Sequence, residues 1–245
     1  MLGRTSCVVL AVLLCCCIAG AAFAADIVSV PTANQLKAGE VDVAAYYFWI
    51  DQDGLIPGVR SLDIDNVRLE TLYAGLTDRW EIDVLRQDVD VPIVALPGGV
   101  VVDGVATFVN VNYLALPETA KYPAVVVGGW DVTQEFGHAS WYVCTAKTLN
   151  PPVGGPPTGP IYRLHLSLGT GTEALFAEER HQGIFGGLQV LVRPMYPQVG
   201  LVGLWDGTDV ITAVCFTPDP KWPTFKGGTF GDHWWAGLSF TFNAK

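Results

Sequence analysis

The sequence predicts an all-β protein, a closed antiparallel transmembrane β-barrel of about 12 strands, with 10 strands as the fallback. Three observations favour this class: a repeated apolar–polar alternation, a low content of charged residues, and an N-terminal export signal. After residue 25, no apolar run approaches the ~20 residues that a membrane helix needs. Apolar residues dispersed by alternation in an exported, weakly charged chain are typical of membrane β-barrels.

The N-terminus has the pattern of a secretory signal peptide. Arg4 is the only charge before an uncharged run that ends in Ala22-Phe23-Ala24. A basic start, an apolar middle and small residues at the end predict cleavage after Ala24. We therefore expect a signal peptide over residues 1–24 and a single barrel domain over 25–245, with an uncleaved membrane anchor as the alternative.

The net charge of the chain limits which kinds of partner it can bind. The formal net charge is −10 at pH 7, and it becomes more negative when Arg4 leaves with the signal. This balance argues against nucleic acid as a partner. Charged residues make up 16% of the chain, against about a quarter in ordinary soluble domains. A soluble β-protein would need more charge than this to solvate the outer faces of its strands.

The cysteines and histidines do not predict a metal centre. Four of the six cysteines lie in the signal, so only Cys144 and Cys215 remain in the exported chain. Export permits a disulfide, but the sequence does not determine whether these two residues pair. Two cysteines and scattered histidines supply too few ligands for a metal site, and we expect no cofactor.

Strands are predicted from the period-two alternation of apolar residues. The regular segments are residues 40–50, 66–76, 80–87, 105–115, 161–170, 188–193 and 233–242. The less regular candidates are residues 124–132, 139–149, 199–206 and 209–217. Membrane barrels usually have an even number of strands, so a twelfth is expected in 26–33 or in 218–232. Residues 172–180 favour at most a short helical turn. Clusters of Pro and Gly at 96–104, 150–160 and 218–223 predict connections.

Each strand is expected to turn its apolar side to lipid and its polar side to the lumen. On this basis Val67, Leu69, Ile82 and Leu166 would face outward. The polar residues expected to face the lumen are Arg68, Glu70, Glu81, Asp83, Asn110, Asn112, Arg163, His165, Ser167, Gln189 and Arg193. The aromatic residues expected at the two membrane interfaces are Trp49, Tyr73, Trp80, Tyr113, Trp130, Tyr162, Trp205 and Trp234.

Alternation alone does not distinguish a membrane barrel from a soluble barrel or sandwich. The soluble folds have the same period, but their apolar face points inward. Aromatic residues at the segment ends favour lipid, because such rings form belts at membrane surfaces. The last segment also ends with Phe240 and Phe242 on its apolar side, close to the end of the chain. We therefore predict that the apolar face contacts lipid.

Catalytic chemistry has little support in the sequence. His165 and Ser167 share the polar face of one segment with Arg163, but a nucleophile–base pair needs a third, orienting group. Acids and arginines could also pair across a narrow lumen. Hydrogen bonds and ion pairs that fill the lumen explain these residues more simply, so the sequence predicts a protein that is not an enzyme.

Several segments resemble bacterial outer-membrane barrels. SVPTANQLKAGEVDVAAYY is similar to a first strand preceded by "PTA" and a glycine, and LYAGLTDRWEIDV is similar to a recurrent hairpin of these proteins. The ordered segments YPAVVVGGWDVTQEFGHASWYVCTAKTL, YRLHLSLGTG and GIFGGLQVLV resemble the YjbH-like family. This resemblance implies a role in exopolysaccharide production or export.

Three functions follow as hypotheses. The first is a non-enzymatic outer-membrane barrel that is structural or assists export of envelope polysaccharide. The second is a small channel with a narrow lumen, and the third is a soluble exported barrel that binds an apolar ligand. The first two imply a Gram-negative-type outer membrane, with the lipid bilayer and the outer-membrane assembly machinery as partners and polysaccharide as a further one.

Overall fold

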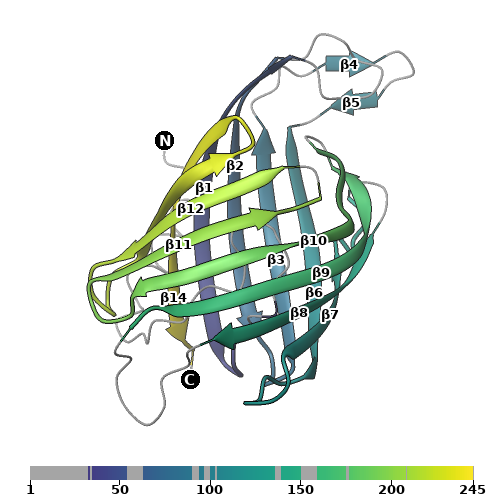
Figure 1. Ribbon diagram of the computed structural model, residues 1–245. Helices are drawn as coiled ribbons and strands as arrows, with labels where there is room; N and C mark the ends of the chain where they lie inside the picture. The colour runs from purple at the N-terminus through teal and green to yellow at the C-terminus, as the bar shows by residue number, and fades with distance from the viewer. Residues whose placement is uncertain are drawn as a thin grey trace.

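The computed structural model describes residues 33, 35–53, 63–89, 94–96, 100–102, 104–135, 139–149, 159–174, 177–207 and 209–244. Twelve strands form a closed barrel, and two short strands form a separate sheet beyond its rim (Figure 1). The barrel strands are β1 (Glu40–Asp53), β2 (Asp63–Gly75), β3 (Trp80–Val89), β6 (Val105–Leu116), β7 (Ala124–Trp130), β8 (Ser140–Leu149), β9 (Ile161–Ala174), β10 (Ala177–Arg193), β11 (Gln198–Trp205), β12 (Val210–Thr217), β13 (Thr224–Phe230) and β14 (His233–Asn243).

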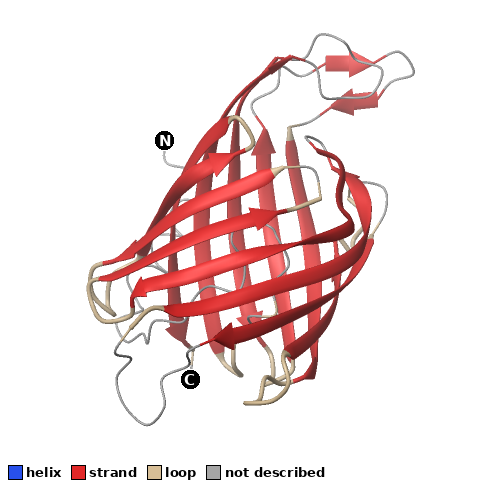
Figure 2. Ribbon diagram, viewed as in Figure 1, coloured by secondary structure: helices blue, strands red, loops and turns tan. Residues whose placement is uncertain are grey.

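The barrel is closed by its first and last strands. β1 pairs with β14 from Glu40 opposite Asn243 to Trp49 opposite Trp234. All neighbouring strands are antiparallel (Figure 2), and closure removes the unpaired edges of an open sheet. We call the end at which β1 begins and β14 ends the terminal end, and the opposite end the distal end.

The predicted fold class, a closed antiparallel barrel of 12 strands, is confirmed. The twelfth strand is β13, in the second of the two segments where it was expected. Residues 26–32, which make up most of the other segment, lie outside the described residues. Among the described residues, no helix is long and apolar enough to cross a membrane.

Two connections differ from the expectation. The helical turn predicted over 172–180 is wrong, because β9 and β10 extend into this segment, with Arg180 opposite Thr172. Continued pairing satisfies the backbone polar groups of both strands, whereas a single helical turn is marginal by itself.

The connection predicted over 96–104 contains part of a small hairpin, in which β4 (Val94–Leu96) pairs with β5 (Val100–Val102). Of the connection at 150–160, residues 150–158 lie outside the described residues.

The turn between β2 and β3 fixes the register of the first hairpin. The hydroxyl of Thr77 accepts the backbone N–H groups of Arg79 and Trp80 at 3.1 and 3.0 Å. The N–H of Leu76 donates to the carbonyl of Trp80 at 2.8 Å. Thr side chains commonly stabilise turns in this way. The turn is therefore short, and β3 begins at once on Trp80, whose ring lies 4.7 Å from that of Tyr113.

The outer wall of the barrel is apolar over most of its surface. Exposed aliphatic side chains cover the middle of the strands, and they include Leu72, Val84, Val143, Leu164, Leu166, Leu168, Leu188, Leu201, Val214 and Leu238. Outward aromatic residues near the distal end are Tyr47, Trp49, Trp141, Trp205 and Trp234. Those near the terminal end are Trp80, Tyr113, Tyr162, Phe216, Phe225, Phe240 and Phe242. We call these two groups the distal belt and the terminal belt.

The predicted orientation of β2 is wrong. Val67, Leu69 and Tyr73 are 2%, 6% and 0% exposed and face the interior, whereas Arg68 and Glu70 face outward. The reason lies in the hairpin register.

Residues opposite each other on paired strands point to the same side of the sheet. Tyr73 lies opposite Asp83, and Glu70 lies opposite Arg86. Because Asp83 faces inward, Tyr73 must do so too. Glu70 and Arg86 share the outer face, where their side chains form an ion pair at 3.7 Å.

Aromatic side chains pack in the distal half of the interior, which also buries Asp131, Ser140 and Asp206 near its rim, and most other buried polar side chains lie in the terminal half, called the polar half. In the distal half, the ring of Trp235 stacks on Phe48 at 6.2 Å and meets Tyr46 edge-on at 5.9 Å. Phe108 packs on Trp130 at 4.8 Å. The buried polar side chains of the terminal half include Asp42, Glu81, Asp83, Asn110, Asn112, His165, Gln189, Lys226 and Ser239. These buried side chains of the described strands therefore pack into the lumen.

Candidate functional site

A hydrogen-bonded carboxylate pair lies in the terminal half of the interior. Glu81 and Asp83 are adjacent inward positions of β3, and both are fully buried. The Nδ2 of Asn112 on β6 donates to Glu81 Oε1 and to Asp83 Oδ2, each at 3.1 Å. The hydroxyl of Tyr142 donates to Asn112 Oδ1. These bonds join β3, β6 and β8 along one part of the inner wall, and they hold the two acids where water does not solvate them.

A glycine makes room for this network. A Cβ atom at Gly128 on β7 would lie 2.4 Å from Cζ of Tyr142 and 2.5 Å from Oδ1 of Asn112. Gly128 thus allows the Tyr142 ring to cross its strand and reach Asn112. In strands, glycine often marks such a close approach.

A buried lysine occupies another part of the polar half. Lys226 on β13 is 7% exposed, and its Nζ donates to the hydroxyl of Tyr46 at 3.1 Å. Asp42 on β1 is also buried and accepts a hydrogen bond from the hydroxyl of Thr241 on β14. These contacts tie the closing strands together from the inside. Lys226 and Asp42 were not among the residues predicted to face the lumen, although both lie on the side of their strands opposite the apolar outer face.

The residues just before β1 form a strap, residues 33 and 35–39, that folds into the terminal mouth of the barrel. Leu36 is 3% exposed, and its backbone N–H donates to Glu81 Oε2 at 2.7 Å. The N–H of Ala38 donates to Asp78 Oδ1 at 3.2 Å, and that of Gly39 donates to the carbonyl of Gly75 at 2.8 Å. The strap is therefore held by the turn and the ends of the β2–β3 hairpin.

Arg163 holds the strap from the other side of the mouth. Its Nη2 donates to the carbonyl of Ala33 at 3.2 Å, and its Nη1 donates to the hydroxyl of Thr148 at 2.9 Å. Nη1 also lies 3.4 Å from Oε2 of Glu118, in the turn between β6 and β7. The strap thus spans the mouth between β3 and β9. Periodicity could not reveal it, since a single pass of irregular chain has no repeating pattern.

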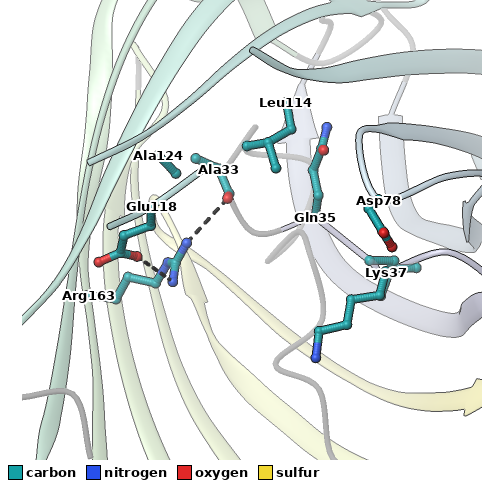
Figure 3. Close-up of a pocket in the computed structure, with 9 residues that line it drawn as sticks. Ala33, Gln35, Lys37, Asp78, Leu114, Glu118, Ala124 and Arg163 are labelled. Atoms are coloured by element: carbon teal, nitrogen blue, oxygen red, sulfur yellow. Dashed lines mark hydrogen bonds and ion pairs between the residues drawn. The ribbon is translucent and has the colours of Figure 1, made fainter. Parts of the chain in front are cut away.

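A cavity of about 450 Å³ remains beside the strap at the mouth. Its lining residues are Ala33, Gln35, Leu36, Lys37, Asp78, Leu114, Glu118, Ala124 and Arg163. Figure 3 shows Arg163 and Glu118 on one side of the cavity, with Gln35, Lys37 and Asp78 on the other. Charged side chains, an amide side chain and apolar side chains therefore meet at this cavity.

The structure places most residues expected in the lumen on the inner face. Those that are buried there are Glu81, Asp83, Asn110, Asn112, His165, Ser167 and Gln189, with Arg163 partly buried. Arg68 and Glu70 are on the outer wall instead, because of the hairpin register. Arg193 is exposed at the end of β10, beyond an irregularity in the pairing between Leu191 and Arg193.

Two of the aromatic residues expected at the membrane interfaces lie inside the barrel. Tyr73 is fully buried, and Trp130 is 5% exposed and packs against Phe108. Trp130 ends β7 on the same face as Val126 and Gly128, so its strand phase turns it inward. The others lie on the outer wall: Trp49, Trp80, Tyr113, Tyr162, Trp205 and Trp234.

The structure does not assemble the candidate chemical groups into a reacting set. No hydrogen bond joins the side chains of His165 and Ser167 in the described part of the chain. Among the described residues, no group of three or more His, Cys, Asp or Glu side chains is placed to hold a metal ion. Cys144 and Cys215 are both buried and free, so they do not pair.

No protein-family model matches the sequence, and no curated protein matches it.

Replacing Gly75 with alanine tests how the strap is held. A Cβ atom at Gly75 would lie 2.1 Å from the carbonyl oxygen of Lys37, so the strap must move. We expect faster trypsin cleavage after Lys37, measured by mass spectrometry of the cut product. Each ~1.4 kcal/mol by which the strap is destabilised gives about tenfold faster cleavage when cleavage follows the open population.

Gly203→Ala is the control, because nothing lies within 4 Å of a Cβ atom at Gly203. Its cleavage after Lys37 should match that of the unmodified protein. An equal rate in Gly75→Ala would show that the strap is not seated on β2.

Proposed function

We propose that this chain is a non-enzymatic integral membrane barrel of a Gram-negative-type outer membrane, with a structural or assisting role in the envelope. The observation that carries the proposal is the distribution of polarity. The outer wall is aliphatic between two aromatic belts, while Asp42, Glu81, Asp83 and Lys226 are buried inside. A membrane barrel needs this arrangement, because lipid cannot solvate charge and aromatic rings prefer the two interfaces.

The polarity argues against the soluble alternative. A soluble barrel would bury its aliphatic side chains and expose its charges to water. Here Leu164, Leu166 and Leu168 are each more than half exposed on β9, while the intervening His165 and Ser167 are 3% and 2% exposed. A water-facing wall of this kind would be a large apolar patch, which monomeric soluble proteins rarely expose.

The charged group on β2 and β3 fits the same interpretation. Arg68 and Arg86 lie on the distal halves of their strands, and Glu70, next to the middle of β2, forms ion pairs with both. Arg68 lies opposite Tyr47 of the distal belt. Charged side chains on the outer face are tolerated near the membrane interface and are costly at its midplane. The group would therefore sit at the level of the lipid headgroups.

The filled interior favours a structural or assisting role over that of a channel. Side chains that line a water-filled bore remain accessible to water, whereas Tyr46, Phe108, Phe185 and Trp235 are at most 2% exposed. Wide aqueous channels need barrels of ~16 strands. Assistance in exopolysaccharide export, within a YjbH-like family, rests on the sequence resemblance.

Membrane fractionation tests the proposal directly. We expect the exported protein in the membrane pellet, extractable with detergent, together with faster migration on gels before boiling than after it. The signal sequence predicts a mature chain that begins at Ala25, which N-terminal sequencing would check. Recovery in the aqueous periplasmic fraction would remove the proposal.

Planar bilayer recording distinguishes the barrel from a channel. We expect no steady conductance from the inserted protein, because aromatic side chains fill the distal half of the lumen. Insertion is verified in parallel by protease protection in vesicles of the same lipid. Stable, stepwise currents from verified insertions would instead support the channel function.

A further inference from the structure

The cavity at the terminal mouth contains a polar group without a partner. Among the described residues, the side-chain amide of Gln35 has neither a donor for Oε1 nor an acceptor for Nε2, although both atoms are buried. Buried amides without hydrogen bonds are costly, and native proteins keep few of them. Gln35 offers one donor and one acceptor side by side, and a peptide group satisfies such a pair with two hydrogen bonds.

Two exposed charges at the cavity are without an ionic partner in the part of the chain that the structure describes. Lys37 makes no ion pair within the described residues, and neither does Asp78, whose carboxylate accepts only the N–H of Ala38. The other two charges are paired with each other, since Arg163 contacts Glu118 at 3.4 Å. Among its described lining residues, the cavity thus offers one cation and one anion without an ion pair, on the side that also carries Gln35 (Figure 3).

We propose that this cavity binds a short free peptide. Gln35 would pair with a peptide bond, Lys37 with the terminal carboxylate and Asp78 with the terminal ammonium group. Leu36, Leu114 and Ala124 supply an apolar wall for small side chains. The volume of about 450 Å³ lies within the range of small-molecule sites, ~300–1,000 Å³.

The charge balance selects this class of ligand over others. Lys37 and Arg163 offset Asp78 and Glu118, so the lining has no net charge and does not favour a polyanion or a simple cation. A zwitterion that carries an amide matches all three unpartnered groups. This site would exist in the folded barrel whether or not the barrel is in lipid, so the proposal does not depend on the proposed function.

Calorimetric titration of the full chain, folded in detergent, tests the proposal with alanyl-alanine and trialanine as probes. We expect saturable binding of at least one of them. N-acetylation of the same peptide removes the ammonium group, and C-amidation removes the carboxylate. Each modification should weaken binding about tenfold, the effect of losing one charged hydrogen bond. No binding up to ~10 mM peptide, or equal binding of free and capped peptides, would overturn the proposal.

Variants assign the contacts. Gln35→Leu removes both hydrogen-bonding atoms, and Gln35→Glu keeps the acceptor but loses the donor; each should weaken binding about tenfold. Asp78→Asn should bind free and N-acetylated peptides equally, because the group that distinguishes them is gone.

Lys221→Gln is the matched control for Lys37→Gln, since Lys221 is an exposed lysine in the β12–β13 turn at the same end of the barrel. Lys37→Gln should lose the preference for a free carboxylate, and Lys221→Gln should keep it. Heat-modifiable migration verifies that each variant is folded. If folded Gln35→Leu and Gln35→Glu bind the peptide as the unmodified protein does, the site is not the one proposed.

Discussion

Replacing Trp235 with alanine is expected to lower the free energy of unfolding by about 3–5 kcal/mol, the usual cost of truncating a large buried aromatic side chain. Trp235 is 2% exposed, stacks on Phe48 and meets Tyr46 edge-on. Its Nε1 also donates to the carbonyl of Thr229 at 3.2 Å. Removing the indole leaves a cavity between β1 and β14, where the barrel closes. Urea titration in detergent, followed by the fraction that migrates as folded barrel, measures the loss.

The neighbouring residue provides the control. Trp234 directly precedes Trp235 in β14, but its side chain points outward and is 66% exposed. Trp234→Ala removes the same side chain without opening an internal cavity, so it should cost a small fraction of the effect at Trp235. Equal losses at the two positions would contradict a packed lumen, as would Trp235→Ala without any loss.

The sequence predicts the architecture well because local pattern and closure determine it. Alternation located eleven of the barrel strands, and the need for an even number pointed to a twelfth in 218–232, where β13 lies. The turn at 77–79 was visible in the break of the pattern between residues 66–76 and Trp80. Inward positions such as Glu81, Asn112 and His165 were found because each is a polar residue between apolar neighbours on a single strand.

The error on β2 has a different origin. On this strand both faces carry apolar residues, Val67 and Leu69 on one side and Leu72 on the other, so polarity alone selects the wrong phase. The register with β3 contains the missing information, since Tyr73 and Asp83 are opposite each other and share a face. If the register of β2 with β3 is considered before faces are assigned, the inward orientation of Tyr73 follows from that of Asp83.

The mouth of the barrel was beyond sequence reasoning. The strap, Arg163 and Glu118 meet through contacts between residues far apart in the chain, such as Arg163 with Ala33. These contacts depend on the closed shape of the barrel, and irregular chain has no periodicity to reveal them. A lumen filled by hydrogen bonds and ion pairs was expected from the polar faces of the strands. Its buried aromatic part was not, since Trp130, which packs on Phe108 inside the barrel, was expected at a membrane interface.

Replacing Leu166 with arginine tests whether the outer wall of the barrel contacts lipid or water. Leu166 lies in the middle of β9 and is 56% exposed. If the wall faces lipid, an arginine there should destabilise the barrel by about 2–4 kcal/mol, the cost of arginine near the bilayer midplane. If the wall faced water, the same change would be nearly neutral, because exposed substitutions usually lie within about 0.5 kcal/mol. Equilibrium unfolding in phospholipid vesicles distinguishes the two outcomes.

Val210→Arg is the matched control at the edge of the wall. Val210 begins β12 at the distal end and is 53% exposed, so it resembles Leu166 in accessibility and differs in depth. The cost of arginine falls to about 0–1 kcal/mol near the interface, and Val210→Arg should therefore be much less destabilising than Leu166→Arg. Accessibility alone predicts no difference between the two variants, whereas a bilayer around the barrel requires one. Equal unfolding free energies would mean that the apolar wall does not span a membrane.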